Sequence, residues 1–275
     1  MQLNILTVDV EDYFQVQAFA SVVTRSSWDQ YASRIENNTL NLLDILDEHH
    51  AHGTFFILGW VAERYPGLIR EIVKRGHEPA CHSYWHRLIY QLECREFRDD
   101  TLQAKDVIEQ AASTTVRGYR APSFSITSRS LWALEILVEA GFSYDSSIFP
   151  GRHDIYGIPG APRVPFRIET ASGSLLEYPV TTFRCGGQNF PVGGGGYLRI
   201  PPLWYTRFGI RRLRKESVPL IAYVHPWEID PEQPRIAASL KSRFRHYTNL
   251  NKMESRLRAV LRYNSPFSMI SQRGM

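Results

Sequence analysis

Acidic side chains cluster where the first β-like run of the chain ends. Asp9, Glu11 and Asp12 follow the apolar run Leu3–Val8 within four positions. Three carboxylates so close together repel one another unless a cation lies among them, and parallel α/β folds build their sites at the carboxyl ends of strands. A solvated turn explains the same pattern. The segment is therefore a candidate metal or acid–base site if other segments of the chain supply further ligands or catalytic side chains.

Two histidines follow the third β-like run, His77–Cys81. If a helical turn begins there, His82 and His86 lie on one face, within reach of a single ion. Two imidazoles and one carboxylate form a hydrolytic metal set that leaves positions open for water and substrate. Exposed histidines often fall four positions apart by chance. The position after a strand favours a metal site, because it places this pair at the same end of a parallel sheet as the acids.

Three further polar residues end β-like runs. Arg120 precedes Ala-Pro, where the chain is extended or turning, and an arginine there is suited to hold a carboxylate. Asp145 follows the short run 142–144, where a turn or N-cap role is the structural alternative. His225 ends the buried run Leu220–Val224 and precedes a proline, so it is suited to act as a general acid near neutral pH. A packed histidine is the alternative there.

The elements that must position these residues alternate along the chain. We expect strands at 3–8, 54–58, 77–81, 115–119, 142–144 and 218–224, and helices at 39–49, 60–74, 95–112, 129–140, 203–215 and 249–262. Such alternation predicts an α/β fold with a parallel sheet, either a barrel or open. Residues 150–202 are rich in Gly and Pro, with hairpin-like strands near 174–183, and are expected to be an insertion or a set of loops.

Composition excludes several classes of protein. The 275 residues are 43% hydrophobic and 22% charged, which rules out disordered and low-complexity chains and favours one domain or two. Three cysteines without a CxxC pair argue against a disulfide framework or a thiolate zinc site and favour a reducing compartment. No signal peptide or membrane-spanning segment is recognised, so we expect a cytoplasmic protein or one peripheral to the inner face of the membrane.

The net charge of +4 conceals an uneven distribution. Residues 234–275 hold nine Lys and Arg against one acid, Glu254, and carry +8, whereas residues 1–233, with the remaining 23 bases and 27 acids, carry −4. The basic segment predicts either solvated helix faces packed on the domain or attraction to an anionic membrane or polymer. Nucleic acid is disfavoured, because no recognition motif accompanies the charge. Because this segment follows the last motif, we expect it to take no part in the chemistry.

Taken in order, these motifs resemble the NodB-homology polysaccharide deacetylases, carbohydrate esterase family 4. The resemblance rests on Asp9 with a nearby second acid, His82-Ser83-x-x-His86, Arg120-x-Pro122, Asp145 and His225, and also on Gly76-His77-Glu78 just before the histidine motif. A closer similarity, to the exopolysaccharide- and exosortase-associated subgroup, rests on the segments Asp9–Phe14, Gly193–Tyr197, Tyr223–Glu228 and Phe244–Tyr247. The resemblance implies a distorted, incomplete (β/α) barrel over residues 1–233, including the insertion at about 150–202, with 234–275 as a basic extension packed on the same domain.

The resemblance also implies a role for each matching residue. Asp9 is similar to the catalytic base, Arg120 to the residue that orients it, and His225 to the acid that protonates the leaving amine. Asp145 is similar to the partner that tunes His225, and the backbone N–H of Ser123 to an oxyanion donor. His82 and His86 are similar to ligands of a divalent metal ion, zinc by ligand type.

One departure leaves the third metal ligand open. Many family members have adjacent aspartates in the first motif, whereas Val10 follows Asp9 here, so the metal carboxylate is Glu11 or Asp12, and we favour Glu11. Aromatic residues near the motifs, among them Tyr13, Trp85 and Trp227, either stack on sugar rings or pack at the rim.

The activity implied is metal-dependent hydrolysis of N-acetyl groups on an N-acetylhexosamine polysaccharide or its lipid-linked precursor, with release of acetate. Hydrolysis of other non-peptide C–N bonds, as in allantoinase-like relatives, and a non-catalytic glycan-binding module are the alternatives on the same fold. A non-haem iron oxygenase would also use two histidines and one carboxylate, but no co-substrate motif accompanies them.

Overall fold

Strand β1 (Asn4–Val10) is an interior strand of the main sheet in the computed structural model, which describes residues 4–273. It pairs in parallel with β10 (Ile221–Val224) on one side and with β2 (Thr54–Ile57) on the other. The side chains of Ile5, Leu6, Val8 and Val10 are all buried. A strand covered on both faces requires such a continuous apolar run, which is why the sequence pattern identified it.

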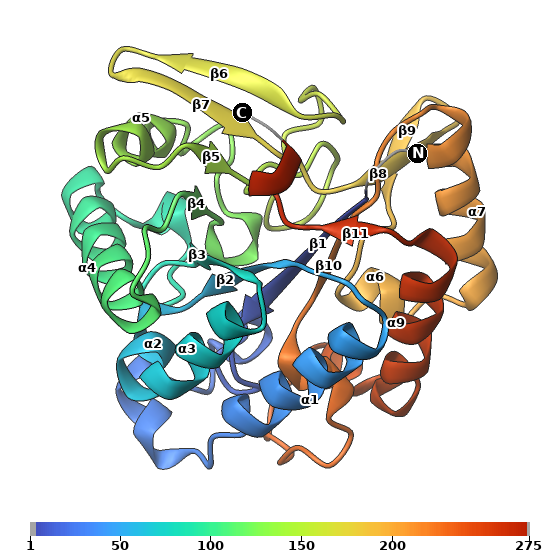
Figure 1. Ribbon diagram of the computed structural model, residues 1–275, viewed down its shortest axis with the longest axis horizontal. Coiled ribbons are helices and arrows are strands. Elements are labelled where there is room, and N and C mark those ends of the chain that lie inside the picture. The colour runs from blue at the N-terminus through green and yellow to red at the C-terminus, as the bar shows by residue number, and fades with distance from the viewer. Residues whose placement is uncertain (1–3, 274–275) are drawn as a thin grey trace.

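The main sheet has nine strands in the order β10-β1-β2-β3-β4-β5-β7-β6, and β11 pairs with the start of β1 (Figure 1). Neighbouring strands are parallel except in the β6–β7 hairpin. The remaining strands of this sheet are β3 (Glu78–Cys81), β4 (Gly118–Tyr119), β5 (Tyr144–Asp145), β6 (Phe166–Thr170), β7 (Gly173–Glu177) and β11 (Phe267–Ser268). A separate hairpin is formed by β8 (Thr182–Cys185) and β9 (Gln188–Pro191).

The gap between the two ends of this sheet is crossed by irregular chain. Thr181 Oγ1 accepts a hydrogen bond from Ile221 N at 2.7 Å, and Gly194 forms a single parallel bridge with Tyr223 of β10. A Cβ atom on Gly194 would lie 1.7 Å from the Tyr223 carbonyl oxygen, so only glycine allows this approach. The result is a distorted, incomplete (β/α) barrel, and the predicted fold class is confirmed.

Helices pack around the strands (Figure 1). They are α1 (Ile35–Glu48), α2 (Gly59–Arg64), α3 (Pro66–Lys74), α4 (Cys94–Ala112), α5 (Trp132–Glu139), α6 (Gly196–Arg199), α7 (Leu203–Lys215), α8 (Leu240–Tyr247) and α9 (Leu250–Asn264). The predicted helix at 203–215 coincides with α7. The single helix predicted at 60–74 is wrong, because Pro66 has no N–H to continue α2 and instead begins α3.

The segment 150–202 is more regular than the sequence indicated. Strand β7 pairs in parallel with β5, through Tyr144–Leu176 and Asp145–Glu177, so this segment extends the main sheet. The β8–β9 hairpin, helix α6 and the irregular residues 150–165 lie outside the main sheet. The hairpin-like strands expected near 174–183 correspond to β7 and β8, whereas β6, in which every residue is partly or fully exposed, was not expected.

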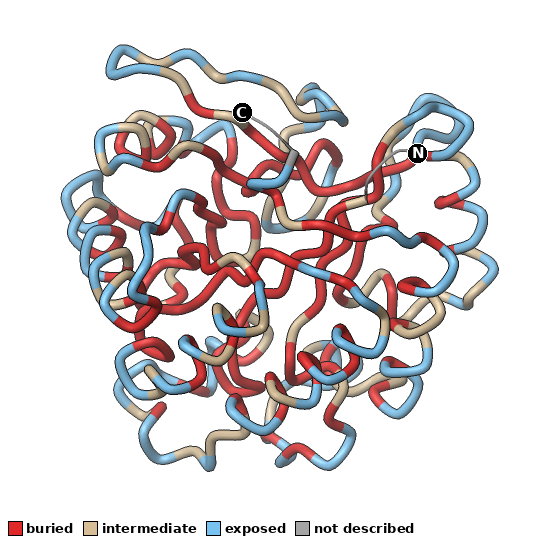
Figure 2. Tube along the Cα trace, in the orientation of Figure 1, coloured by how far each residue is buried: buried red, intermediate tan, exposed pale blue. Residues whose placement is uncertain are grey.

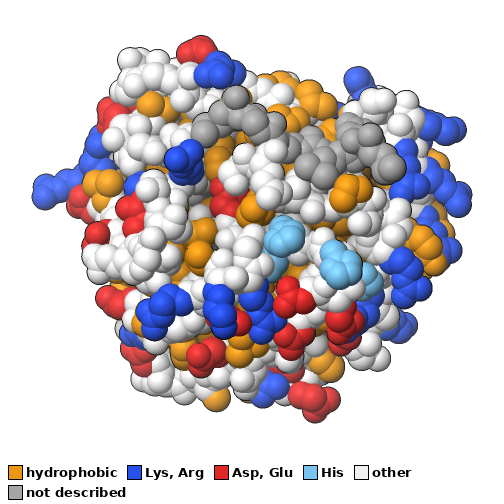
Figure 3. All heavy atoms as spheres, viewed as in Figure 1, with side chains coloured by type: hydrophobic (Ala, Val, Ile, Leu, Met, Phe, Trp, Pro, Cys, Tyr) orange, Lys and Arg blue, Asp and Glu red, His pale blue; other side chains and the backbone are white. Residues whose placement is uncertain are grey.

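Residues after 233 are packed into the domain. Helix α9 buries Leu250, Met253, Leu257 and Leu261 in the main hydrophobic core. Strand β11 lies beside β1, and Ile270 N donates a hydrogen bond to Thr54 Oγ1. Figure 2 shows buried chain at the centre of the molecule and exposed chain on the outer turns of the helices. In Figure 3, Lys and Arg side chains gather along the edge where α7 lies.

Strand register brings the carboxyl ends of the parallel strands to one edge. Val10 pairs with Ile57, Ile57 with Cys81, and Cys81 with Tyr119. The residues that directly follow β3, β4 and β10 are His82, Arg120 and His225. The sheet therefore gathers the motifs at one end, as the alternation of elements predicted.

Candidate active site

Asp9 lies at the carboxyl end of β1 and is held by Arg120. The Arg120 guanidinium donates to Asp9 Oδ1 at 2.7 Å and to Thr7 Oγ1 at 2.8 Å. Its other nitrogens donate to the carbonyl and hydroxyl oxygens of Ser146, at 3.0 and 2.8 Å. Both charged side chains are almost fully buried. The four bonds fix the guanidinium, so the Asp9 carboxylate has one defined orientation.

Glu11, His82 and His86 converge on one point. One ligand atom from each lies within 4.8 Å of the other two. Glu11 Oε2 and His86 Nε2 are 2.8 Å apart, yet this buried oxygen accepts no hydrogen bond from any residue in the described range. Buried carboxylate oxygens require a partner, so the donor set fits a divalent cation between these side chains.

The protonation states of His82 and Glu11 also suit a bound cation. His82 Nδ1 lies 2.7 Å from the Arg120 carbonyl oxygen. When Nδ1 carries the proton and donates it to this oxygen, Nε2 keeps a lone pair that is available to a metal ion. Burial lowers the pKa of His82 to about 4, so the ring is neutral at pH 7. Burial alone would raise the pKa of Glu11, but the neighbouring His86, followed by His225 and His82, lowers it to about 2. An ionised carboxylate and a neutral imidazole are what a metal ligand set needs.

The histidine loop is not helical, which corrects the expectation of a helical turn. Ser83 and His86 have φ angles of 63° and 51°, in the left-handed region. The loop is held instead by Asp100 on α4, whose carboxylate accepts from Tyr84 N at 2.8 Å and from Trp85 N at 3.3 Å. Asp100 is a supporting residue that the sequence reasoning missed, because nothing local links it to the histidine motif.

Asp12 points away from the metal ligands. Its carboxylate accepts hydrogen bonds from Ser33 Oγ at 2.7 Å and from Arg34 N at 2.8 Å, next to the start of α1. Tyr13 N also donates to it, at 2.8 Å. The structure thus places Glu11, and not Asp12, with the two histidines.

Glu228 is the hydrogen-bond partner of His225, where the resemblance implied Asp145. His225 Nδ1 lies 3.0 Å from Glu228 Oε2, which also accepts from His225 N at 3.2 Å. Arg199 Nε donates to the other carboxylate oxygen at 3.1 Å, and the side chains of both Arg199 and Glu228 are buried. Glu228 is three residues beyond His225, and this N-cap spacing at the start of a 3₁₀ turn is the signal that could have identified it.

The environment of His225 favours its protonated form. Burial lowers its pKa, but the hydrogen bond and charge of Glu228, followed by the charges of Glu11 and Asp9, raise the pKa to about 9. His225 Nε2 lies 3.8 Å from Asp9 Oδ2 and 3.5 Å from Glu11 Oε1. The Asp9 carboxylate, a candidate proton acceptor, and the His225 ring, a candidate proton donor, therefore lie side by side next to Glu11.

Asp145 pairs with a second buried acid, Glu177 of β7. Ser147 Oγ donates to Asp145 Oδ1 at 2.5 Å, and Ile148 N donates to Glu177 Oε1 at 2.9 Å. Burial raises the pKa of Asp145 to about 6, and burial together with the neighbouring Asp145 raises the pKa of Glu177 well above its usual value. This pair anchors the turn that presents Ser146 to Arg120. Asp145 therefore lies behind Arg120, and its hydrogen-bond partner is Ser147, whereas that of His225 is Glu228.

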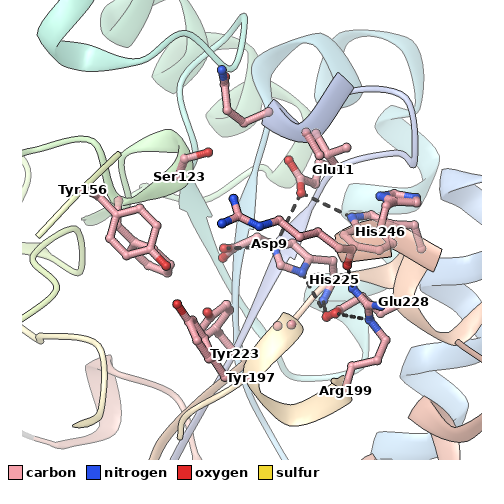
Figure 4. Close-up of a pocket in the computed structure, with 18 of the residues that line it drawn as sticks. Asp9, Glu11, Ser123, Tyr156, Tyr197, Arg199, Tyr223, His225, Glu228 and His246 are labelled. Atoms are coloured by element: carbon pink, nitrogen blue, oxygen red, sulfur yellow. Dashed lines mark hydrogen bonds and ion pairs between the residues drawn. The ribbon is translucent and has the colours of Figure 1, made fainter. Parts of the chain in front are cut away.

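A cavity of about 420 Å³ opens over these residues. Figure 4 shows Ser123 and Tyr156 on the opposite side from Glu11 and His246, with Asp9 between them. Ser123 has a φ of 52° and lines the cavity, and the role of its backbone N–H as an oxyanion donor stays a prediction.

Of the three aromatic residues proposed to stack on sugars, only Trp227 lines the cavity. Trp227 is enclosed between the rings of His225 and His246, with centroid distances of 5.2 and 4.1 Å, and its Nε1 donates to Glu11 Oε1 at 3.3 Å. Trp227 therefore helps to position Glu11, a candidate metal ligand. Tyr13 is buried against Phe14, and Trp85 packs on Trp28, so neither is placed to stack on a sugar in this cavity.

The second half of the chain supplies much of the cavity wall. Tyr156, Tyr197 and Tyr223 form an aromatic side, and Arg245 and His246 come from α8. Residues 234–275 thus contribute to the cavity wall, and the expectation that they take no part in the chemistry stays a prediction. Sequence reasoning gave none of these residues a place at the site, because Tyr156, Tyr197, Arg245 and His246 follow no strand of the motif series and Tyr223 lies within β10.

Comparison with protein-family models divides the chain in two. Residues 25–144 match the model described as polysaccharide deacetylase, and residues 146–273 match one described as a domain of unknown function (DUF3473). The candidate metal ligands His82 and His86 and the residue Arg120 fall in the first match, and His225 falls in the second. Asp9, Glu11 and Asp145 lie outside both matches.

Curated relatives are similar over part of the chain. A peptidoglycan-N-acetylglucosamine deacetylase of Bacillus cereus is 30% identical over 98 residues, which are 35% of this chain and 36% of the relative. A chitooligosaccharide deacetylase of Sinorhizobium fredii is 38% identical over 85 residues, or 30% of this chain and 40% of the relative. The matched segments thus span less than half the length of these relatives.

Solved structures share the fold. A protein classed as a polysaccharide deacetylase from Mycobacterium smegmatis superposes with a TM-score of 0.64 at 21% identity, covering 98% of this chain and 89% of its own. A carbohydrate esterase family 4 pseudoenzyme from Bacillus anthracis gives a TM-score of 0.52 at 15% identity, covering 98% and 64%. At these identities the likeness concerns architecture alone.

Proposed function

We propose that this chain, whose residues 25–144 match the polysaccharide deacetylase model, is a hydrolase that removes N-acetyl groups from an N-acetylhexosamine-containing glycan and releases acetate. The observation that carries the proposal is the meeting of three units in one cavity: the ligand set Glu11, His82 and His86, the Asp9–Arg120 pair, and His225. Amide hydrolysis needs these functions: an electrophile site, a base and an acid.

The protein's own residues divide the proton transfers. Asp9, oriented by Arg120, accepts the proton of the attacking water. His225, protonated near neutral pH and held by Glu228, gives a proton to the nitrogen so that the amine leaves. The backbone N–H of Ser123 is proposed to stabilise the oxygen that becomes negative as water adds to the carbonyl. Asp145 acts at a distance, through the turn that holds Ser146 against Arg120.

We propose a divalent ion, zinc by ligand type, bound by Glu11, His82 and His86. When bound, such an ion would polarise both the water and the acetamide carbonyl. Support comes from the unpartnered buried oxygen of Glu11 and from the neutral ring of His82.

The substrate proposed is a polysaccharide or its lipid-linked precursor, as in the exopolysaccharide-associated subgroup that the sequence resembles. The aromatic side of the cavity supports a sugar ligand, because Tyr156, Tyr197 and Tyr223 offer ring faces and hydroxyl groups. The tyrosines take the place of Tyr13, Trp85 and Trp227 in this proposal.

The charge of residues 234–275 makes a peripheral place at an anionic membrane part of the proposal. Within residues 4–273 no helix has the length and apolar character needed to cross a bilayer.

The test is acetate release from N-acetylhexosamine oligomers, measured together with bound metal. We expect turnover that is lost on metal removal and restored by zinc or another divalent ion, and a His82→Ala variant that binds little metal and is inactive. Bound metal with no acetate release from any N-acetylated glycan would refute the deacetylase assignment and indicate a glycan-binding module. Ammonia or urea release from cyclic amides would indicate a hydrolase of other C–N bonds.

A further inference from the structure

Four large apolar side chains are exposed on segments that also contribute residues to the cavity lining or directly adjoin it. They are Ile155, Trp204, Leu240 and Phe244, which are 38%, 67%, 82% and 60% exposed, and we call them the rim patch. Exposed apolar residues are ordinary when they are scattered, but a group at the entrance of a binding cavity marks an interaction surface.

The contacts of α8 place this patch at the entrance. Arg245 and His246, which directly follow Phe244, line the cavity, and so does Ile155. Arg199 NH2 donates to the Arg245 carbonyl oxygen at 2.8 Å, which ties α8 to α6. Trp204 lies in the first turn of α7, three residues after Pro201, which lines the cavity.

Helix α8 is anchored on one side and open on the other. His246 packs on Phe19 with a centroid distance of 4.6 Å, and Nε2 of His246 lies 2.6 Å from Gln233 Oε1. Leu240 and Phe244 lie one turn apart on the outer face. The helix thus presents two apolar side chains outward from a fixed base, and ordering them on a partner costs little backbone entropy.

Basic residues surround the rim patch. Lys241, Arg243 and Arg245 lie on α8 among its apolar residues, and all three are exposed. Asp154 partly balances this charge, at 3.5 Å from Lys241 and 3.2 Å from Arg245. On α7, Arg207 is also exposed, three residues after Trp204. Trp, Phe and Leu next to Lys and Arg are the side chains that bind the interface of an anionic bilayer.

We propose that the rim patch docks on the surface of an anionic membrane, with the mouth of the cavity facing the lipid headgroups. An acidic protein would satisfy the charges equally, but the high exposure of Leu240 and Phe244 on one short helix suits shallow insertion between lipids better. This orientation assigns a membrane-anchored N-acetylated glycan as the substrate class. That assignment rests on the proposed deacetylase activity, whereas the docking itself does not.

The test is sedimentation of the full chain with vesicles of phosphatidylcholine containing roughly one-third phosphatidylglycerol, compared with phosphatidylcholine alone. The test variant is Leu240→Glu/Phe244→Glu. The matched control is Leu102→Glu/Leu131→Glu, which changes two leucines of 44% and 46% exposure, on α4 and just before α5, by the same charge. Circular dichroism confirms that all three proteins are folded.

We expect the unmodified chain to bind the anionic vesicles, the rim variant to bind at least about tenfold more weakly, and the control variant to differ much less. Binding by the unmodified chain should weaken as salt is raised. No binding to anionic vesicles, equal binding to neutral vesicles, or equal loss in the control variant would each overturn the proposal.

Acetate release from a soluble oligosaccharide, measured on the same proteins, keeps the two proposals apart. The rim variant should retain this activity, because Leu240 and Phe244 lie outside the cavity lining. Vesicle binding without any deacetylation would leave the docking surface in place and refute the enzyme assignment instead. Deacetylation by a chain that does not bind anionic vesicles would do the reverse.

Discussion

Glu228→Gln is the substitution that tests the geometry of the site most directly. The change keeps the size of the side chain but removes its charge. In the native site one Glu228 oxygen accepts from His225 and the other from Arg199, and both neighbours are buried. A glutamine has a single acceptor oxygen, so either His225 Nδ1 or Arg199 Nε loses its partner.

The expected loss of activity follows from the role of His225. A general acid contributes about 100-fold to 10,000-fold to the rate, and a histidine that is no longer held in its donor orientation forfeits most of that factor. This corresponds to about 3–5 kcal/mol in the activation free energy, since each tenfold is about 1.4 kcal/mol. The loss should appear in kcat more than in KM, because Glu228 acts on His225 and the substrate is bound elsewhere in the cavity.

The pH dependence provides a second readout with a defined sign. Glu228 is the main influence that raises the pKa of His225 to about 9 against the effect of burial. His225 must be protonated to act as an acid, so the alkaline limb of kcat/KM should move to lower pH in Glu228→Gln. The variant should therefore lose more activity at pH 8.5 than at pH 6.5. Breaking a buried ion pair also destabilises the fold, by about 3–5 kcal/mol, which thermal unfolding measures.

Asp145→Asn is the matched control, because the resemblance gave Asp145 the role that the structure gives Glu228. We expect this variant to leave the alkaline limb in place. An unchanged kcat and pH profile in Glu228→Gln would refute the reasoning. So would a shift of the alkaline limb in Asp145→Asn as large as in Glu228→Gln.

Three further predictions concern the remaining acids of the site. Asp9→Asn should keep its bound metal, measured by elemental analysis, and lose about 100-fold to 10,000-fold in acetate release; full activity would contradict the assignment of the base. Glu11→Gln should bind metal at least about tenfold more weakly, whereas Asp12→Asn should keep the metal and lose about 1 kcal/mol of stability near the start of α1. Titration with zinc distinguishes the two variants. Weaker zinc binding by Asp12→Asn than by Glu11→Gln would contradict the ligand set. Glu177 has a pKa well above the usual value of 4.5, so the native chain loses stability as pH rises above about 4.5 and Glu177 must stay protonated. Glu177→Gln should therefore gain in melting temperature over the native chain between pH 4.5 and pH 8, and an equal difference at both pH values would count against a buried protonated acid.

Much of the fold was determined by the sequence alone. The continuous apolar run of β1 and the helical spacing of α7 are local patterns, and they predicted these elements because burial on both faces or on one stripe dictates which side chains are apolar. The ends of parallel strands meet at one edge, so the order of the motifs along the chain was sufficient to bring Asp9, His82 and His225 together.

Tertiary structure decided which polar atoms meet at that edge. Asp145 and Glu228 are both acids close to a strand end, and no local pattern states which carboxylate reaches Nδ1 of His225. The answer depends on Arg199, a residue of α6 that holds Glu228 from the far side. Similarly, the left-handed backbone at His86 takes the place of a helical turn because Asp100 of another helix binds the loop.

The basic C-terminal segment most clearly separates what the sequence determines from what tertiary structure decides. Its charge is a property of the sequence, and the sequence alone placed it beyond the last motif. Only the packing of α8 on Phe19 and Gln233 brings His246 into the cavity wall and turns Leu240 and Phe244 outward at its mouth. The reason is physical: side-chain directions follow from contacts between residues far apart in the chain, which composition and periodicity do not contain.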